Sequence, residues 1–193
     1  MDIDNIIQGR RSSFPAQYSG DKIPERVVLH LLENANWAPT HYHTEPWRFK
    51  VFADGGLNRL MDALAAIYKE RTPEEAFSQA KFEKYTDRKS KVSHAIVIVM
   101  KKSLRPDLPE VEEVCATACA VQNMWLTLAN YPQYGGYWST GHLVYTDEFR
   151  EFLHLEEDEM CLGIFYLGSL REDAREIPGR RGDWNEKVSF QYN

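Results

Sequence analysis

The sequence predicts a mixed α and β fold in which a sheet is covered by helices on both faces. Residues 95–100 read Ala-Ile-Val-Ile-Val-Met, an apolar run without alternation, as expected for a strand that is buried on both sides. Residues 27–35 and 111–128 carry apolar side chains at amphipathic helical spacing. At 193 residues the chain can bury one substantial core and has little room for a second, so we expect a single domain over residues 1–193.

The first half of the chain is predicted to be mostly helical. A helix over residues 2–9 is followed by one that begins at Pro24 and ends at Pro39, because proline suits the first turn of a helix and breaks its interior. A strand-like run occupies residues 47–52. Residues 57–69 place apolar side chains near one helical face. The charged segment 71–93 is expected to be partly helical, with a solvated face.

The second half is predicted to contain the longest helix. It follows Pro109, where several glutamates favour a helix N-terminus, and it ends before Pro132. Gly135 and Gly136 are expected to form a permissive turn into residues 137–141. A short helix over 147–153, a strand over 162–168 and a short strand over 187–190 complete the prediction.

Composition and charge exclude several classes of protein. A formal net charge of −6 argues against a general nucleic-acid binder, which relies on clustered Lys and Arg. No apolar run reaches the length of a membrane helix, and the acidic N-terminus is unlike a secretory signal, so we expect a cytoplasmic protein without membrane contact. Three cysteines, Cys115, Cys119 and Cys161, suit a reducing compartment and are assigned to core packing.

Two polar segments carry the candidate chemistry. Arg10, Arg11 and Ser12 follow the first helix, and guanidinium forks beside a hydroxyl suit the oxygens of a phosphate monoester. The alternative is that both arginines only cap the helix, where cations oppose the negative end of its dipole. The second segment, residues 38–49, reads Ala-Pro-Thr-His-Tyr-His-Thr-Glu-Pro-Trp-Arg-Phe. Polar side chains held between two prolines suit the edge of a planar ring, and the alternative is a surface turn with incidental histidines.

These segments resemble the motifs of the FMN-dependent nitroreductase family, and the resemblance extends over nearly the whole chain. It is greatest to compact bacterial members related to YdjA, whose Gly-Gly-x-Trp-Arg-Ser-Gly segment corresponds to residues 135–141. The resemblance implies an α+β fold, a three-layer sandwich in which a mostly antiparallel central sheet is flanked by helices. It also implies a homodimer with FMN in the subunit interface.

The resemblance further implies which residues surround the cofactor. No catalytic side chain and no metal are required, because the isoalloxazine carries the chemistry, although His41 or His43 can supply a proton. Arg180 and Arg181 are both candidates to reach the phosphate, and Arg181 is preferred. The expected FMN-binding residues are Arg10, Arg11, Ser12, His41, His43, Glu45, Trp138, Ser139, Thr140 and Arg181.

The implied activity is the ping-pong reduction of a small acceptor, such as a nitroaromatic or a quinone, by NAD(P)H. The chain departs from the family pattern at four positions, each of which loses a cation or an amide: Phe14 replaces Arg, His43 replaces Asn, Glu45 replaces Gln and Ser139 replaces Arg. A flavin-binding sensor or carrier with little turnover is therefore one alternative. A metal-dependent hydrolase that uses His41, His43 and Glu45 as ligands is the other.

Overall fold

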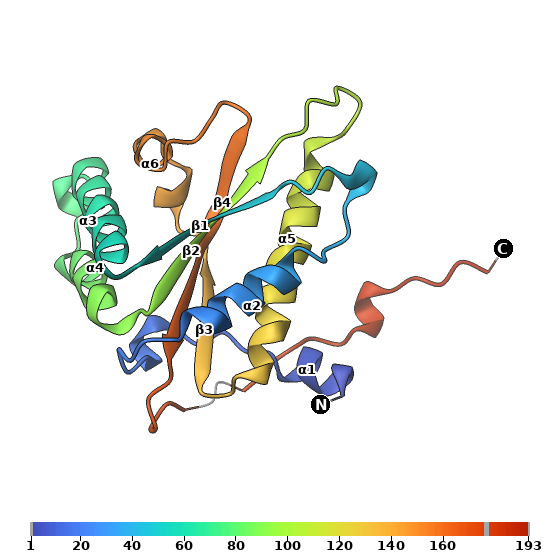
Figure 1. Cartoon of the computed structure of the whole chain (residues 1–193), viewed down its shortest axis with the longest axis horizontal. Helices are drawn as coiled ribbons and strands as arrows, with labels where there is room; N and C mark the ends of the chain where they lie inside the picture. The colour runs from blue at the N-terminus through green and yellow to red at the C-terminus, as the bar shows by residue number, and fades with distance from the viewer. Residues whose placement is uncertain (1, 176–177, 193) are drawn as a thin grey trace.

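A computed structural model describes residues 2–175 and 178–192. Within them, four strands form one antiparallel sheet in the order β1-β2-β4-β3, with α2 and α5 on one face and α3, α4 and α6 on the other (Figure 1). The predicted mixed fold with an antiparallel sheet between helices is confirmed. The strands are β1 (Trp47–Ala53), β2 (His94–Lys101), β3 (Tyr134–Ser139) and β4 (Glu159–Ser169). The helices are α1 (Ile3–Gly9), α2 (Glu25–Ala35), α3 (Asp54–Arg71), α4 (Gln79–Lys91), α5 (Glu110–Thr127) and α6 (Asp147–Phe152).

Strand β2 lies in the interior of the sheet, as its apolar run predicts. It pairs with β1 on one side and with β4 on the other, and residues 95–100 are almost completely buried. Val97 and Val99 point into the core beneath α3, whereas Ile96 and Ile98 point into the core beneath α2 and α5. Each face of the strand therefore supplies its own hydrophobic layer.

Helix α5 buries only part of the stripe that its spacing favours, together with residues outside that stripe. Ala120, Val121 and Met124 are fully buried, while Val111 remains 63% exposed. Cys115 is also exposed, so its assignment to the core is wrong; among the other two cysteines, Cys161 is buried and Cys119 is half-buried. The helix is apolar on more than one side, so periodicity alone cannot choose the buried side, and one apolar face stays open on the single chain.

The predicted turn at Gly135 and Gly136 is wrong. Both glycines lie inside the strand. A Cβ added to Gly135 would lie 2.5 Å from the Cβ of Ser13, and one added to Gly136 would lie 2.6 Å from Cζ of Phe165. Glycine is required at these two positions because Ser13 and Phe165 of the same chain pack closely against them, and not because the backbone adopts a special conformation.

The predicted strand over residues 187–190 is also wrong for the described chain. Residues Asn185–Lys187 form a short 3-10 turn, and the rest of the tail extends away from the body (Figure 1). Val188, Phe190 and Tyr192 are 45%, 64% and 87% exposed. A strand is stable only when another strand accepts its backbone hydrogen bonds, and the tail pairs with no described strand of its own chain.

Candidate functional site

A pocket of about 510 Å³ lies where the end of α1 meets α5 and the free edge of β3. β3 is the last strand of the sheet, so its outer edge can accept hydrogen bonds from the segment that follows α1. The backbone N–H of Ser13 donates to the carbonyl oxygen of Gly136 (2.9 Å), and the Tyr18 hydroxyl donates to the carbonyl oxygen of Ser13 (2.6 Å). These bonds hold Ser13, directly after the arginine segment, against the strand.

The charged side chains that line this pocket are arginines. Arg10, Arg11 and Arg175 line it together with Ser12, and no carboxylate is found among its described lining residues. The chain as a whole has a net charge of −6, so this local excess of cations does not follow from the composition. The pocket is suited to an anion.

Arg10 has the most specific surroundings in the pocket. Its Nη1 is buried and has no hydrogen-bond partner within the described part of the chain. The guanidinium lies over the Trp125 ring, with Cζ 4.3 Å from the ring centroid. Burial, followed by the nearby charges of Arg181 and Arg11, lowers the pKa of Arg10 from its usual value. A buried donor without a partner is costly, and a bound anion would remove that cost.

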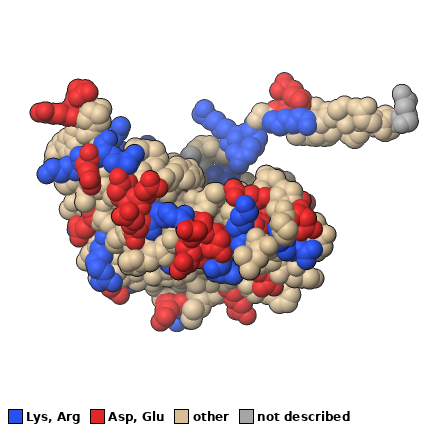
Figure 2. Space-filling model, turned by 90° about the horizontal axis from the view of Figure 1, so that it is seen from above, with Lys and Arg blue, Asp and Glu red and all other residues tan. Residues whose placement is uncertain are grey.

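The C-terminal tail brings further positive charge to the same place. Arg181 lies near enough to lower the pKa of Arg10, and its Nη1 donates to the carbonyl oxygen of Arg180 (2.7 Å). A Cβ added to Gly179 would lie 2.5 Å from Nη2 of Arg11, so the tail crosses directly over that side chain. Figure 2 shows basic side chains gathered at the base of the extended tail. Of the two tail arginines, Arg181 is the one whose charge acts on Arg10, although neither is among the residues that line the pocket.

Trp138, Ser139 and Thr140 lie at the other end of β3. A strand rises about 3.3 Å per residue, which places Ser139 roughly 10–13 Å from the two glycines that border the arginine pocket. The indole Nε1 of Trp138 donates to the carbonyl oxygen of Leu162 (3.0 Å), which fixes the ring against β4. Ser139 is half-buried and Thr140 is exposed. One strand thus joins the cationic pocket to an aromatic ring and two hydroxyls.

The loop between α2 and β1 has an unusual backbone. Tyr42, His43 and Glu45 have φ angles of 53°, 54° and 43°. Non-glycine residues rarely adopt this left-handed region, and such strained conformations are most frequent at functional sites. Nδ1 of His41 lies 2.5 Å from Oε2 of Glu112, and the Tyr42 ring stacks on the imidazole with 4.0 Å between centroids. These contacts fix His41 beside the N-terminal end of α5.

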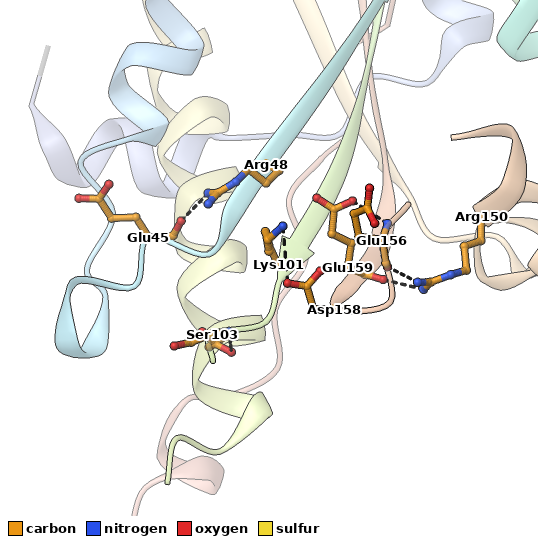
Figure 3. Close-up of polar contacts among 9 residues, drawn as sticks. Glu45, Arg48, Lys101, Ser103, Arg150, Glu156, Asp158 and Glu159 are labelled. Atoms are coloured by element: carbon orange, nitrogen blue, oxygen red, sulfur yellow. Dashed lines mark hydrogen bonds and ion pairs between the residues drawn. The ribbon is translucent and has the colours of Figure 1, made fainter. Parts of the chain in front are cut away.

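The side chains of His43 and Glu45 face outward from this loop. Both residues are exposed. Figure 3 shows the Glu45 carboxylate pointing away from the ion pair of Lys101 and Asp158, whose charged atoms are 3.5 Å apart. Arg48 donates from Nη1 to the backbone carbonyl oxygen of Glu45 (2.7 Å) and leaves the carboxylate exposed. The two side chains are therefore accessible to a ligand or to a second chain.

The structure brings two of the three predicted groups of site residues together and leaves the third apart. The arginine group borders the start of β3, and the group from Trp138 to Thr140 lies at the end of the same strand. The loop group contacts α5 at Glu112, whereas the arginine group contacts it at Trp125. These two contacts are 13 positions apart along the helix, or roughly 20 Å at about 1.5 Å per residue. Figure 1 shows the loop and α1 at opposite ends of α5.

Three residues of the site could not be found from the sequence. In the sequence, Trp125 is only one apolar position of a predicted helix, and Arg175 is one charge in a polar segment. Glu112 is predicted merely to start α5. Trp125 is 114 positions from its partner Arg11, and Glu112 is 71 positions from its partner His41, so no local spacing signals these contacts.

Neither a metal centre nor a membrane span is visible in residues 2–175 and 178–192. No group of three or more His, Cys, Asp or Glu side chains there is placed to hold a metal ion, so the hydrolase alternative built on His41, His43 and Glu45 gains no support. No helix there combines the length and the apolar character that crossing a membrane requires.

Comparison with known proteins gives a consistent result. The model of the nitroreductase family matches residues 7–169. YfhC of Bacillus subtilis (strain 168), which is named as an NAD(P)H nitroreductase, is 28% identical over 177 residues that cover 91% of this chain and 88% of YfhC. YdjA of Escherichia coli (strain K12), named likewise, is 25% identical over 170 residues that cover 88% of each chain.

Solved structures show the same fold. A nitroreductase-like family protein from Bacillus cereus superposes with a TM-score of 0.84 at 28% identity, over 100% of this chain and 97% of the other. The FMN-dependent nitroreductase NfnB from Mycobacterium smegmatis, solved in complex with NADPH, superposes with a TM-score of 0.75 at 18% identity, over 98% and 97% of the two chains.

Proposed function

We propose that this chain, which belongs to the nitroreductase family, is an FMN-dependent NAD(P)H oxidoreductase that reduces small acceptors such as nitroaromatics or quinones. The family predicted from the motifs of residues 10–12 and 38–49 is confirmed by the family match, and the nitroreductase-like fold by the Bacillus cereus structure. The names of YfhC and YdjA support NAD(P)H as the reductant. The FMN dependence of NfnB, which has the same fold, supports the cofactor.

The observation that carries the proposal is the buried, unpartnered Nη1 of Arg10 in a pocket lined by arginines. A phosphate monoester bears a charge of about −2 and strong acceptor oxygens, so it fits this donor and the surrounding cations. Arg10, Arg11 and Arg181 would hold the phosphate, with Ser12 as a further donor. Glycine at 135 and 136 lets Ser13 and Phe165 pack closely against β3 beside the pocket.

The protein would contribute placement and electrostatics. When bound, FMN supplies the hydride-transfer chemistry. Trp138, Ser139 and Thr140 would face its ring at the far end of β3, and the reductant and the acceptor would occupy the space over the ring in turn. His41 would serve as a proton donor or acceptor, because Glu112 engages only its Nδ1 and the side chain is 55% exposed.

The functional unit in this proposal is a homodimer. The outer face of α5 presents the exposed Val111 and Cys115, and α1 presents Ile3 and Ile7, which are 57% and 52% exposed. Exposed apolar side chains towards both ends of α5 suggest a surface that another protein covers. A second copy, related by a two-fold axis, is the simplest partner because the same surface then serves both chains.

A two-fold axis across α5 would also complete the cofactor site. Antiparallel packing of two α5 helices places the Glu112 end of one beside the Trp125 end of the other. The loop with His41, His43 and Glu45 would then approach the arginine pocket of the partner. The exposed apolar tail would extend over the partner as well, which explains why it pairs with nothing described in its own chain.

Anaerobic reduction tests the proposed activity. Purified full-length protein is expected to be yellow or to take up added FMN, and NADH or NADPH should bleach the flavin absorbance. A nitroaromatic or a quinone should then restore the colour without further nicotinamide, as a ping-pong cycle requires. Bound flavin that neither nicotinamide bleaches would identify a carrier or sensor, and failure to bind FMN would contradict the cofactor assignment.

Replacing Glu45 with glutamine is expected to raise the midpoint potential of the bound flavin by roughly 20–60 mV. Reduction makes the flavin more negative, and an ionised carboxylate facing the ring opposes this by about 1–3 kcal/mol at an effective dielectric constant near 20. Spectroelectrochemical titration of both proteins measures the difference. Glu33→Gln removes an exposed carboxylate from α2 and should leave the potential unchanged. Equal potentials for wild type and Glu45→Gln would place Glu45 away from the ring.

A further inference from the structure

Trp125 contacts both arginines that follow α1. The guanidinium of Arg10 lies over the indole ring, with Cζ 4.3 Å from its centroid, and the indole Nε1 donates to the backbone carbonyl oxygen of Arg11 (3.1 Å). The ring also meets Phe165 edge to face, with 5.2 Å between centroids and 81° between planes. The indole is thus anchored in the core beneath α5 while it forms part of the pocket wall.

An aromatic partner leaves an arginine in a different state from an acidic partner. A carboxylate that binds a guanidinium bidentately occupies two N–H donors and cancels the charge. The face of an indole attracts the cation through its quadrupole and leaves the in-plane donors unoccupied. In agreement, Nη1 of Arg10 is buried without a hydrogen-bond partner among the described residues. Trp125 therefore holds Arg10 while keeping its charge and donors available to an anion.

The pocket requires such support because its cations repel one another. Arg181 and Arg11 both act on Arg10, whose pKa is lowered chiefly by burial. Without an attractive surface, a desolvated guanidinium among like charges would turn outward into water. The bond from Nε1 to the Arg11 backbone fixes the next residue to the same indole. Donors that are already in place bind an anion without the entropy cost of ordering them.

We propose that Trp125 is a positioning residue that makes this pocket selective for a phosphorylated flavin over the same flavin without its phosphate. The inference rests on the proposed FMN function, since the anion is the phosphate of that cofactor. Trp125 acts through Arg10 and Arg11. Its replacement should therefore change the ratio of the affinities for FMN and riboflavin, because riboflavin has the same ring and ribityl chain but offers the arginines no anion.

Titration of the full-length protein, freed of flavin, with FMN and with riboflavin tests this inference. Trp125→Leu removes the ring face and the Nε1 bond, and should lower the FMN-to-riboflavin affinity ratio by about 10- to 100-fold. Trp125→Phe keeps a weaker ring face and loses the bond, and should lower the ratio by about 3- to 10-fold. Trp37→Leu is the control, since Trp37 is 81% exposed, and it should leave the ratio unchanged.

Thermal unfolding of each variant shows whether it is folded. If Trp125→Leu does not fold, the affinity ratio of Trp125→Phe tests the inference instead. Equal losses for FMN and riboflavin would overturn the inference, because a side chain that only fills space affects both flavins alike. Equal affinities of the wild type for the two flavins would also overturn it. Failure of the wild type to bind either flavin would instead contradict the proposed function.

Discussion

Arg10→Ala is expected to weaken FMN binding by roughly 30- to 5,000-fold, because truncating one partner of a desolvated charge pair typically costs about 2–5 kcal/mol. The stability of the flavin-free protein should change much less. Burial and the charges of Arg181 and Arg11 already disfavour the charged form of Arg10, and this offsets part of the lost contact with Trp125. Flavin titration and thermal unfolding of the same samples separate the two effects.

Arg26→Ala is the matched control for Arg10→Ala. Arg26 is an exposed arginine in the first turn of α2, remote in sequence from the pocket and not among its lining residues. Its removal should leave flavin affinity unchanged. If Arg10→Ala lowered the unfolding temperature while flavin affinity stayed the same, Arg10 would serve only to cap α1, where a helix-end cation contributes about 0.3–1 kcal/mol.

The sequence predicts an element well where local pattern and burial coincide. β2 is an example, since its apolar run is buried from both sides and admits no other arrangement. α5 is the opposite case. Its apolar residues surround most of the helix, so the spacing cannot tell whether Val111 and Cys115 or Ala120 and Met124 face the sheet. That choice depends on the packing of α2 and β2 against the helix, which no local pattern contains.

The site shows the same division between local and distant information. Arg10, Arg11 and Ser12 are consecutive, so they reach the same pocket together and their motif can be recognised in the sequence. Trp125 and Glu112 join the site only through the fold. The glycine pair is a related case. Glycine is typical both of a turn and of a close approach between segments, and only the packing of Ser13 and Phe165 against β3 distinguishes the two.

The tail and the loop around His41 have incomplete surroundings in a single chain. Apolar side chains at 188, 190 and 192 extend into solvent, and the strained loop lies roughly 20 Å along α5 from the arginines that it is predicted to serve. Both features are expected if the surfaces meet a second copy. In the proposed dimer, the second copy would bring together the predicted site residues that one chain holds apart.

Cys115→Arg is expected to convert the protein to a folded monomer that no longer retains FMN. The side chain is exposed on the single chain, so arginine can be accommodated there without disturbing the core. In the proposed dimer it would be buried on both copies beside the partner's half of the site, and an uncompensated buried charge costs about 3–5 kcal/mol each time. Sedimentation velocity with detection at both protein and flavin wavelengths measures assembly and cofactor content together.

The control for this substitution is Thr86→Arg, which adds the same charge to an exposed position of α4 on the opposite side of the sheet. It should remain dimeric and loaded with FMN. A Cys115→Arg protein that stays dimeric would show that the outer face of α5 is not the interface. A monomeric variant that still binds FMN tightly would show instead that one chain holds the cofactor alone, because a shared site cannot survive dissociation of the chain that supplies its second half.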